Sequence, residues 1–145
     1  MTSSIFPDVN VWLALTYPDH VHHEVAANWL DTMDEAAIFV FCRQTQLGFF
    51  RLLTNSAVLG RDARTQRQCW ETYDRWIDAG KAILAKEPAG LETELRSLTT
   101  TESVSTKEWA DAYLSAFAQT ARLTLVTFDR ALAGKATGAV LLEGK

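Results

Sequence analysis

The chain has 145 residues and a formal net charge of −4 at pH 7, a length typical of one domain. Hydrophobic residues make up 48% and charged residues 22%, a balance that excludes disordered, collagen-like and coiled-coil proteins. No apolar run reaches the ~18 residues that a membrane-spanning helix needs. The opening MTSSIFPDVN shows no secretory signal, and Cys42 and Cys69 are too few for a disulfide framework. We therefore expect one domain over residues 1–145 in a reducing cytoplasm, with no membrane association.

Short apolar runs alternate with helical patterns in the first half of the chain. Strands are predicted over residues 4–7 and 37–42, and the unbroken apolar second run predicts a strand covered on both faces. Helices are predicted over residues 9–15, after Asp19 as N-cap, and over residues 44–54. Three apolar side chains at helical spacing are expected on the buried side of the last of these helices: Leu47, Phe50 and Leu53.

The same alternation continues in the second half. The expected elements are a helix over 65–78, a strand over 81–86, a helix from a capping box at 105–108 to about 121, a strand over 123–127 and an edge strand over 139–142. Strands that alternate with helices in this way predict an α/β domain with a mostly parallel sheet.

Arginine is concentrated in one segment. Residues 1–42 contain six acids and no Lys or Arg, whereas residues 43–75 contain six Arg and three acids, a local charge of +3. A solvated helix face is the simpler interpretation of this pattern. The alternative is a phosphate-binding rim, because the planar donor fork of Arg suits phosphate. Under that alternative, Arg43 and Arg51 are the candidate nucleic-acid-binding residues.

Two predicted strands end in aspartate, Asp8 after residues 4–7 and Asp129 after residues 123–128. Ligands of parallel α/β sheets collect at the carboxyl ends of the strands, so the two carboxylates are expected to converge there. A structural role as helix N-cap explains each aspartate equally well. Helical periodicity places Asp111 on a solvated face, opposite the apolar stripe that begins at Trp109.

The sequence contains no Gly-rich phosphate loop, no G-x-S-x-G elbow and no H-E-x-x-H helix. His20, His22 and His23 are better explained as surface residues than as a metal cluster. Acids without His or Cys partners favour hard ions such as Mg²⁺ or Mn²⁺. A site of this kind suits attack of metal-activated water on a phosphodiester.

Four segments occur in a characteristic order and are distributed over the chain from residue 5 to residue 130. They are IFPDVNVW at 5–12, TQLGFFRLLTN at 45–55, WADAYL at 109–114 and LVTFDR at 125–130. In this order they resemble the PIN domain, and in particular the VapC toxins. The resemblance implies a three-layer α/β/α sandwich with a mostly parallel central sheet. It also implies an Mg²⁺-dependent ribonuclease that acts as the toxin of a type II toxin–antitoxin pair.

By matching position, the resemblance implies that Asp8, Asp111 and Asp129 are the catalytic and metal-binding residues, with Mg²⁺ or Mn²⁺ as cofactor. For Asp111 the resemblance disagrees with the helical periodicity, which predicts a solvated position, and we follow the resemblance. RNA is the implied substrate, a cognate antitoxin the implied partner, and a homodimer the expected assembly. One departure stands out: the family commonly carries Glu just before the Phe-x-Arg of the second segment, where this chain has Gly48. Because the nearest polar alternative is Gln46, one carboxylate is missing.

Two other classes of function stay open. A PIN-like domain with a weakened metal site would bind RNA or a protein without cleaving it. Cleavage of RNA with added Mg²⁺ or Mn²⁺, abolished by EDTA, separates this function from a ribonuclease. A phosphatase with Asp8 as nucleophile is less favoured, because that chemistry usually needs a second acid two residues on, where this chain has Asn10.

Overall fold

The computed structural model describes residues 4–143, so the predicted domain ends at residues 1 and 145 lie outside the described residues. Its strands form one sheet in the order β3-β2-β1-β4-β5, and every neighbouring pair is parallel. The strands are β1 Ser4–Pro7, β2 Ile38–Phe41, β3 Ala82–Leu84, β4 Thr124–Thr127 and β5 Val140–Leu141. The predicted α/β class with a mostly parallel sheet is confirmed.

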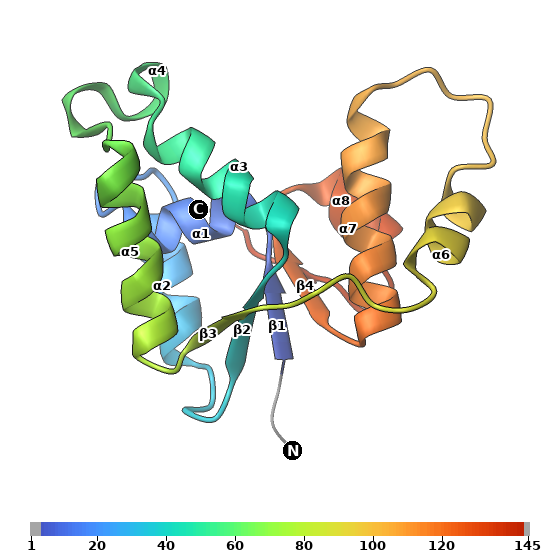
Figure 1. Ribbon diagram of the computed structural model, residues 1–145, viewed down its shortest axis with the longest axis horizontal. Coiled ribbons are helices and arrows are strands. Elements are labelled where there is room, and N and C mark those ends of the chain that lie inside the picture. The colour runs from blue at the N-terminus through green and yellow to red at the C-terminus, as the bar shows by residue number, and fades with distance from the viewer. Residues whose placement is uncertain (1–3, 144–145) are drawn as a thin grey trace.

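Helices cover both faces of this sheet (Figure 1). On one face lie α1 Val9–Thr16, α2 His23–Asp31, α3 Arg43–Leu53 and α5 Gln66–Asp78, and on the other lie α6 Leu91–Leu98, α7 Lys107–Ala121 and α8 Arg130–Lys135. The short helix α4 Ser56–Leu59 and a 3₁₀ turn at Gly60–Asp62 connect α3 to α5. The three-layer sandwich is thus confirmed. Among residues 4–143, no helix is long and apolar enough to cross a membrane.

Aromatic side chains fill the two layers of core. On the α1 side, the fully buried Trp12 stacks on Phe41 with ring centroids 3.9 Å apart. On the α7 side, Phe6 stacks on Phe117 at 5.2 Å. Such pairs add about 0.5–1.5 kcal/mol each beyond the burial of their area. Because Phe41 faces one core and Val40 the other, β2 is covered on both faces, as its apolar run predicted.

Some predicted helix details are wrong. Leu47 in α3 is 50% exposed, and Trp109 in the first turn of α7 is 62% exposed, although both were expected on buried stripes. Helix α2 begins at His23 rather than directly after Asp19. Helix α7 begins after Thr106, whose side chain makes no capping hydrogen bond, so the predicted capping box is not formed. Local patterns therefore locate these helices more accurately than they describe their ends and faces.

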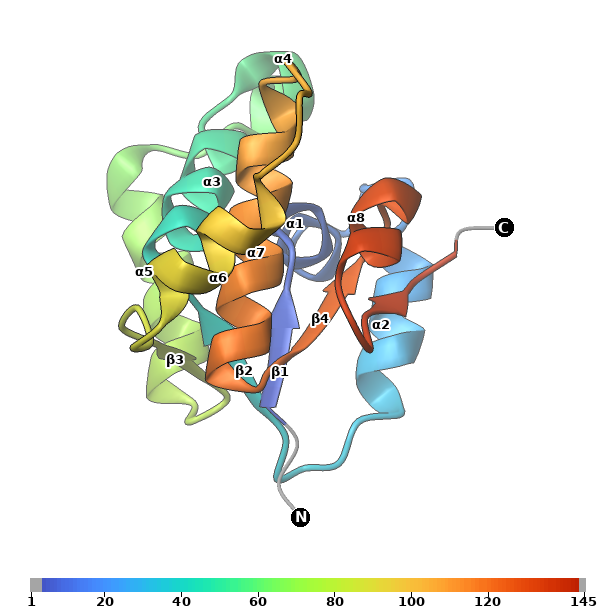
Figure 2. The same ribbon diagram turned by 90° about the vertical axis from the view of Figure 1, so that its right-hand side faces the viewer.

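Asp111 is buried with 6% exposure, and its assignment to a solvated face by periodicity is wrong. Helix α7 packs against α6, α8 and β4, and Figure 2 shows it running alongside the sheet with α6 and α8 beside it. A helix with neighbours on several sides buries most of its circumference, including polar positions. A rule that assumes one buried stripe fails in this environment.

Candidate active site

Strands β1 and β4 are neighbours at the point where the strand order reverses. From β1 the chain adds β2 and β3 on one side of the sheet, and later adds β4 and β5 on the other. In open α/β sheets, ligands bind outside the carboxyl ends of the strands at such a switch point. Asp8 directly follows β1, and Asp129 lies two residues beyond the end of β4. The structure therefore brings the two strand-end acids to the same edge.

Asp8 is held in place through both carboxylate oxygens. Its Oδ1 accepts a hydrogen bond from the Val9 amide at 2.7 Å, at the start of α1, and its Oδ2 accepts one from the Thr127 hydroxyl at 3.0 Å. Burial raises the pKa of Asp8 above its ordinary value, and the negative charges of Asp129 and Asp111 raise it further. The two hydrogen bonds lower the pKa, so burial is the main cause of the rise.

Asp129 combines the N-cap role with a place beside Asp8. Its Oδ1 accepts hydrogen bonds from the amides of Ala131 and Leu132 at 2.9 and 3.2 Å, which caps α8. Its own amide donates to the Thr127 hydroxyl oxygen at 3.0 Å. Because Thr127 also donates to Asp8, one buried hydroxyl links the two strand-end residues. Asp129 can therefore cap α8 and also belong to the candidate site.

Lys107 joins the third acid to this edge. Its Nζ lies 2.7 Å from Oδ2 of Asp129 and 3.2 Å from Oδ2 of Asp111, one helical turn further along α7. Lys135, at the end of α8, places its Nζ 3.5 Å from the same Asp111 oxygen. The hydrogen bond from Lys107 lowers the pKa of Asp129, and the two acids in turn raise the pKa of Lys107. Two ammonium groups thus balance part of the negative charge.

The three carboxylates do not form a ready metal cage. Within residues 4–143, no group of three or more His, Cys, Asp or Glu side chains is arranged to hold a metal ion. The chemistry of the donors nevertheless fits a hard divalent cation, because Mg²⁺ binds through one or two carboxylates and fills its other positions with water and phosphate oxygens. The raised pKa of Asp8 also reflects a repulsion between acids that a bound cation would relieve.

Comparison with known proteins identifies the family. The model of the PIN domain matches residues 5–137. The chain is 44% identical to Ribonuclease VapC41 of Mycobacterium tuberculosis over 128 residues, 86% of this chain and 88% of the relative. The chain belongs to the VapC family of PIN-domain proteins. Ribonuclease VapC29 of the same organism is 32% identical over 133 residues, 90% of this chain and 89% of the relative.

A solved structure supports the fold of this PIN domain. The crystal structure of Mycobacterium tuberculosis VapC20, a sarcin–ricin loop cleaving toxin, superposes with a TM-score of 0.65. The alignment covers 90% of this chain and 93% of VapC20, at 14% sequence identity. At that identity the likeness concerns the fold alone.

Gly48, where the family commonly has Glu, lies in close contact with α1. A Cβ added to Gly48 in α3 would stand 2.7 Å from Cγ1 of Val9, the residue directly after Asp8. Glycine therefore lets α3 approach α1 beside the acidic edge of this PIN domain. Gln46, the polar alternative, is buried and accepts a hydrogen bond from Arg43.

The two candidate arginines differ in position. Arg43 is exposed and is the first residue of α3, close behind the end of β2, so it lies at the same carboxyl edge of the sheet as Asp8. Arg51 is also exposed, in the last turn of α3. Eight residues of helix separate the two, a rise of about 12 Å. Gly48, which meets Val9 beside Asp8, lies between them along the helix.

The histidines are engaged in local packing. His23 places its Nδ1 2.6 Å from the carbonyl oxygen of Ala14. His22 stacks on Phe128 with ring centroids 4.7 Å apart, and the ring of His20 lies 5.8 Å from that of His22. These contacts fasten the start of α2 to α1 and to the segment after β4.

Sequence reasoning missed Lys107 and Thr127. The spacing of Lys107 and Asp111, four residues apart on one helix, places the two on the same face and could have indicated the pair. Thr127 was predicted only as the last residue of the strand over 123–127. Its hydroxyl meets a carboxylate 119 residues away in the sequence, and no pattern in a single sequence reports such a contact.

Proposed function

We propose that this PIN domain hydrolyses RNA in a metal-dependent reaction at the edge of the sheet where Asp8, Asp111 and Asp129 lie. The membership of the VapC family supports the role of toxin ribonuclease in a type II toxin–antitoxin pair. One structural observation carries the choice of site: β1 and β4 are neighbours at the switch point, both are followed by Asp, and Thr127 links the two acids.

In this proposal Asp8, Asp111 and Asp129 hold Mg²⁺ or Mn²⁺. The bound metal would supply an activated water for attack on the phosphodiester and positive charge for the leaving oxygen. Thr127 orients Asp8 through its hydroxyl, and the amides at the start of α8 hold Oδ1 of Asp129. Lys107 keeps the remaining oxygen of Asp129 close to Asp111. The protein thus contributes carboxylates whose orientation is set before the substrate arrives.

For RNA binding we propose that Arg43 contacts phosphates next to the acidic edge and that Arg51 extends the contact along α3. The exposure of both side chains and their separation of two helical turns support this role. A protein of net charge −4 must attract RNA locally rather than through its overall field.

An antitoxin protein and a second copy of the chain are the proposed protein partners. In α5, Tyr73 is buried and Trp76 is packed partly against the core, so most of that stripe stabilises the fold. Trp70 is 47% exposed and meets Phe50 edge-on at 4.8 Å. Trp70, Phe50 and the exposed Leu47 form an apolar surface that supports protein contact. Light scattering at micromolar concentration tests the dimer, and a monomer there contradicts it.

A non-cleaving RNA- or protein-binding domain is the second candidate. The glycine at position 48 and the ammonium of Lys107 between two of the acids favour it, because both weaken the attraction for a metal. Cleavage that depends on Mg²⁺ or Mn²⁺ rules this candidate out.

Induction of the chain in growing cells tests the proposed function. We expect growth arrest with wild type and its relief when an antitoxin-sized protein encoded next to the gene is co-expressed. Asp8→Asn should leave growth unimpaired at the same expression level. Arrest of equal strength with Asp8→Asn would contradict the proposed chemistry.

A further inference from the structure

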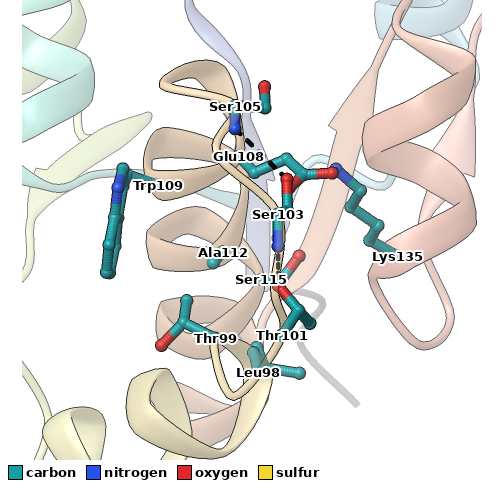
Figure 3. Close-up of a pocket in the computed structure, with 10 residues that line it drawn as sticks. All are labelled: Leu98, Thr99, Thr101, Ser103, Ser105, Glu108, Trp109, Ala112, Ser115 and Lys135. Atoms are coloured by element: carbon teal, nitrogen blue, oxygen red, sulfur yellow. Dashed lines mark hydrogen bonds and ion pairs between the residues drawn. The ribbon is translucent and has the colours of Figure 1, made fainter.

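A pocket of about 350 Å³ lies between α7 and the segment that connects α6 to α7 (Figure 3). Its volume is within the range of small-molecule sites, roughly 300–1,000 Å³. The lining combines hydroxyl groups from the connecting segment, such as Thr101 and Ser103, with the indole of Trp109 and the ammonium of Lys135. Leu98, Ala112 and the indole also supply apolar surface, so the lining suits a ligand with a planar apolar face and polar edges.

Ser115 provides an independent sign that a ligand belongs there. This residue of α7 lines the pocket and is only 5% exposed. Among the described residues, its Oγ has no hydrogen-bond partner. A buried hydroxyl that has lost its water and found no partner is unfavourable. Because that oxygen is itself closed to solvent, a ligand donor or acceptor satisfies it only when the pocket opens around it.

The pocket shares one residue, Lys135, with the surroundings of the proposed active site. Lys135 lines it and also places its Nζ 3.5 Å from Oδ2 of Asp111 and 3.8 Å from Oε1 of Glu108. Figure 3 shows Trp109 and Lys135 projecting on opposite sides of α7. One end of a ligand that reaches from the indole to the ammonium therefore lies beside Asp111.

Trp109 has the exposure that a stacking platform needs. Its side chain is 62% exposed at the start of α7, although the sequence pattern predicted it to be buried. Proteins recognise single-stranded RNA largely by stacking its bases on aromatic side chains and by hydrogen bonds to the base edges. An exposed indole beside buried and exposed hydroxyls offers both kinds of contact.

We propose that this pocket binds one unpaired nucleotide of the RNA, next to the phosphodiester that is cleaved. Its base stacks on Trp109, a base or ribose group hydrogen-bonds to Ser115, and its phosphate lies toward Lys135. This inference rests on the proposed function, since it assigns a subsite to the same substrate. It makes Trp109 and Ser115 determinants of substrate choice rather than catalytic residues.

The test titrates the protein in EDTA with the four nucleoside 5′-monophosphates, followed by amide and indole NMR shifts. We expect shifts at Trp109, Ser115 and the connecting segment for at least one of the four. Trp109→Ala should weaken that binding roughly 5- to 150-fold, whereas Trp109→Phe should retain most of it. Trp70→Ala, at an exposed tryptophan of α5, is the matched control and should leave binding unchanged.

Ser115→Ala separates ligand binding from folding. Because it removes a hydroxyl without a partner, the variant should unfold at the same or a higher denaturant concentration, while its nucleotide affinity falls. In metal-supported cleavage of a mixed RNA pool, Trp109→Ala should raise KM more than it lowers kcat and relax the base preference at one position beside the cut. Absence of nucleotide shifts at the pocket, or an unchanged preference in Trp109→Ala, overturns the subsite. If RNA is still cleaved in that case, the proposed function stands without it.

Discussion

The ammonium group of Lys107 lies 2.7 Å from Oδ2 of Asp129 and 3.2 Å from Oδ2 of Asp111. An amino group on the first turn of α7 therefore already places a positive charge between two of the three acids that we propose as metal ligands. A divalent cation that binds these carboxylates has to compete with it. This competition gives the first prediction.

Lys107→Met should bind Mn²⁺ more tightly than wild type. The side chain of Lys107 is 61% exposed, and exposed ion pairs contribute at most about 1 kcal/mol, so we expect a gain of up to roughly fivefold. Isothermal titration calorimetry without RNA measures it. Lys86→Met, at an exposed lysine before α6, is the control for the change in net charge. Equal or weaker Mn²⁺ affinity in Lys107→Met would show that the ammonium does not compete with the metal.

Asp8→Asn should alter the pH dependence of stability. Burial raises the pKa of Asp8 above its ordinary value of 3.8, so its contribution to stability is complete below pH 3.8 and is lost as the pH rises through the raised pKa. The amide does not titrate. The free energy of unfolding of the variant, relative to wild type in metal-free buffer, should therefore increase from acidic to neutral pH.

Urea denaturation at a series of pH values measures this difference, with the exposed Asp74→Asn as control. A difference between Asp8→Asn and wild type that stays constant or falls as the pH rises would mean that the Asp8 carboxylate carries no burial penalty. It would also remove the repulsion between acids from the account of the site.

Gly48→Glu should restore a carboxylate near the acidic edge at a cost in stability. Its Cβ would stand 2.7 Å from Cγ1 of Val9, and overpacking of this kind typically costs about 1–3 kcal/mol. Val9→Ala removes the obstructing methyl groups, so the double variant should regain stability relative to Gly48→Glu and should bind Mn²⁺ more tightly than Val9→Ala alone. If the stability losses of Gly48→Glu and Val9→Ala simply add in the double variant, the contact between positions 48 and 9 does not have the role assigned to it.

Arg43→Gln should reduce the salt dependence of RNA binding. Each phosphate contact contributes a slope of about −0.7 in log affinity against log salt for single strands, so the loss of one contact should flatten the slope by about that amount. Binding is measured in EDTA to prevent cleavage. Arg122→Gln, at the exposed end of α7 ahead of β4, is the control. An unchanged slope in Arg43→Gln would mean that Arg43 contacts no phosphate and that its role is the hydrogen bond to Gln46.

Asp8 and Asp129 were predictable from the sequence because each follows a short apolar strand, and parallel strands bring their ends to one edge. The order of the strands was not predictable from composition and periodicity, yet it decides that these two residues are neighbours across β1 and β4. The alternation of strands and helices predicted the α/β class and the mostly parallel sheet, whereas the three layers were implied by the family resemblance.

Asp111 shows the limit of periodicity. Its burial depends on α6, α8 and β4 surrounding α7, and a single helix cannot report how many neighbours it has. Only the family resemblance grouped this residue with Asp8 and Asp129, and in the structure Lys107 joins it to Asp129. The close approach of Gly48 to Val9 is likewise a property of two packed helices. Trp109 was misread for the opposite reason, because an apolar side chain at helical spacing was expected to be buried.

Metal-dependent RNA cleavage by purified protein tests the central claim most directly. Wild type should cleave single-stranded RNA with Mg²⁺ or Mn²⁺, lose the activity in EDTA and regain it when excess metal is added. Asp8→Asn should remain folded and inactive under every condition, and Asp74→Asn should match wild type. Cleavage that persists in EDTA, or wild-type cleavage by folded Asp8→Asn, would contradict a metal-dependent ribonuclease at this edge of the sheet.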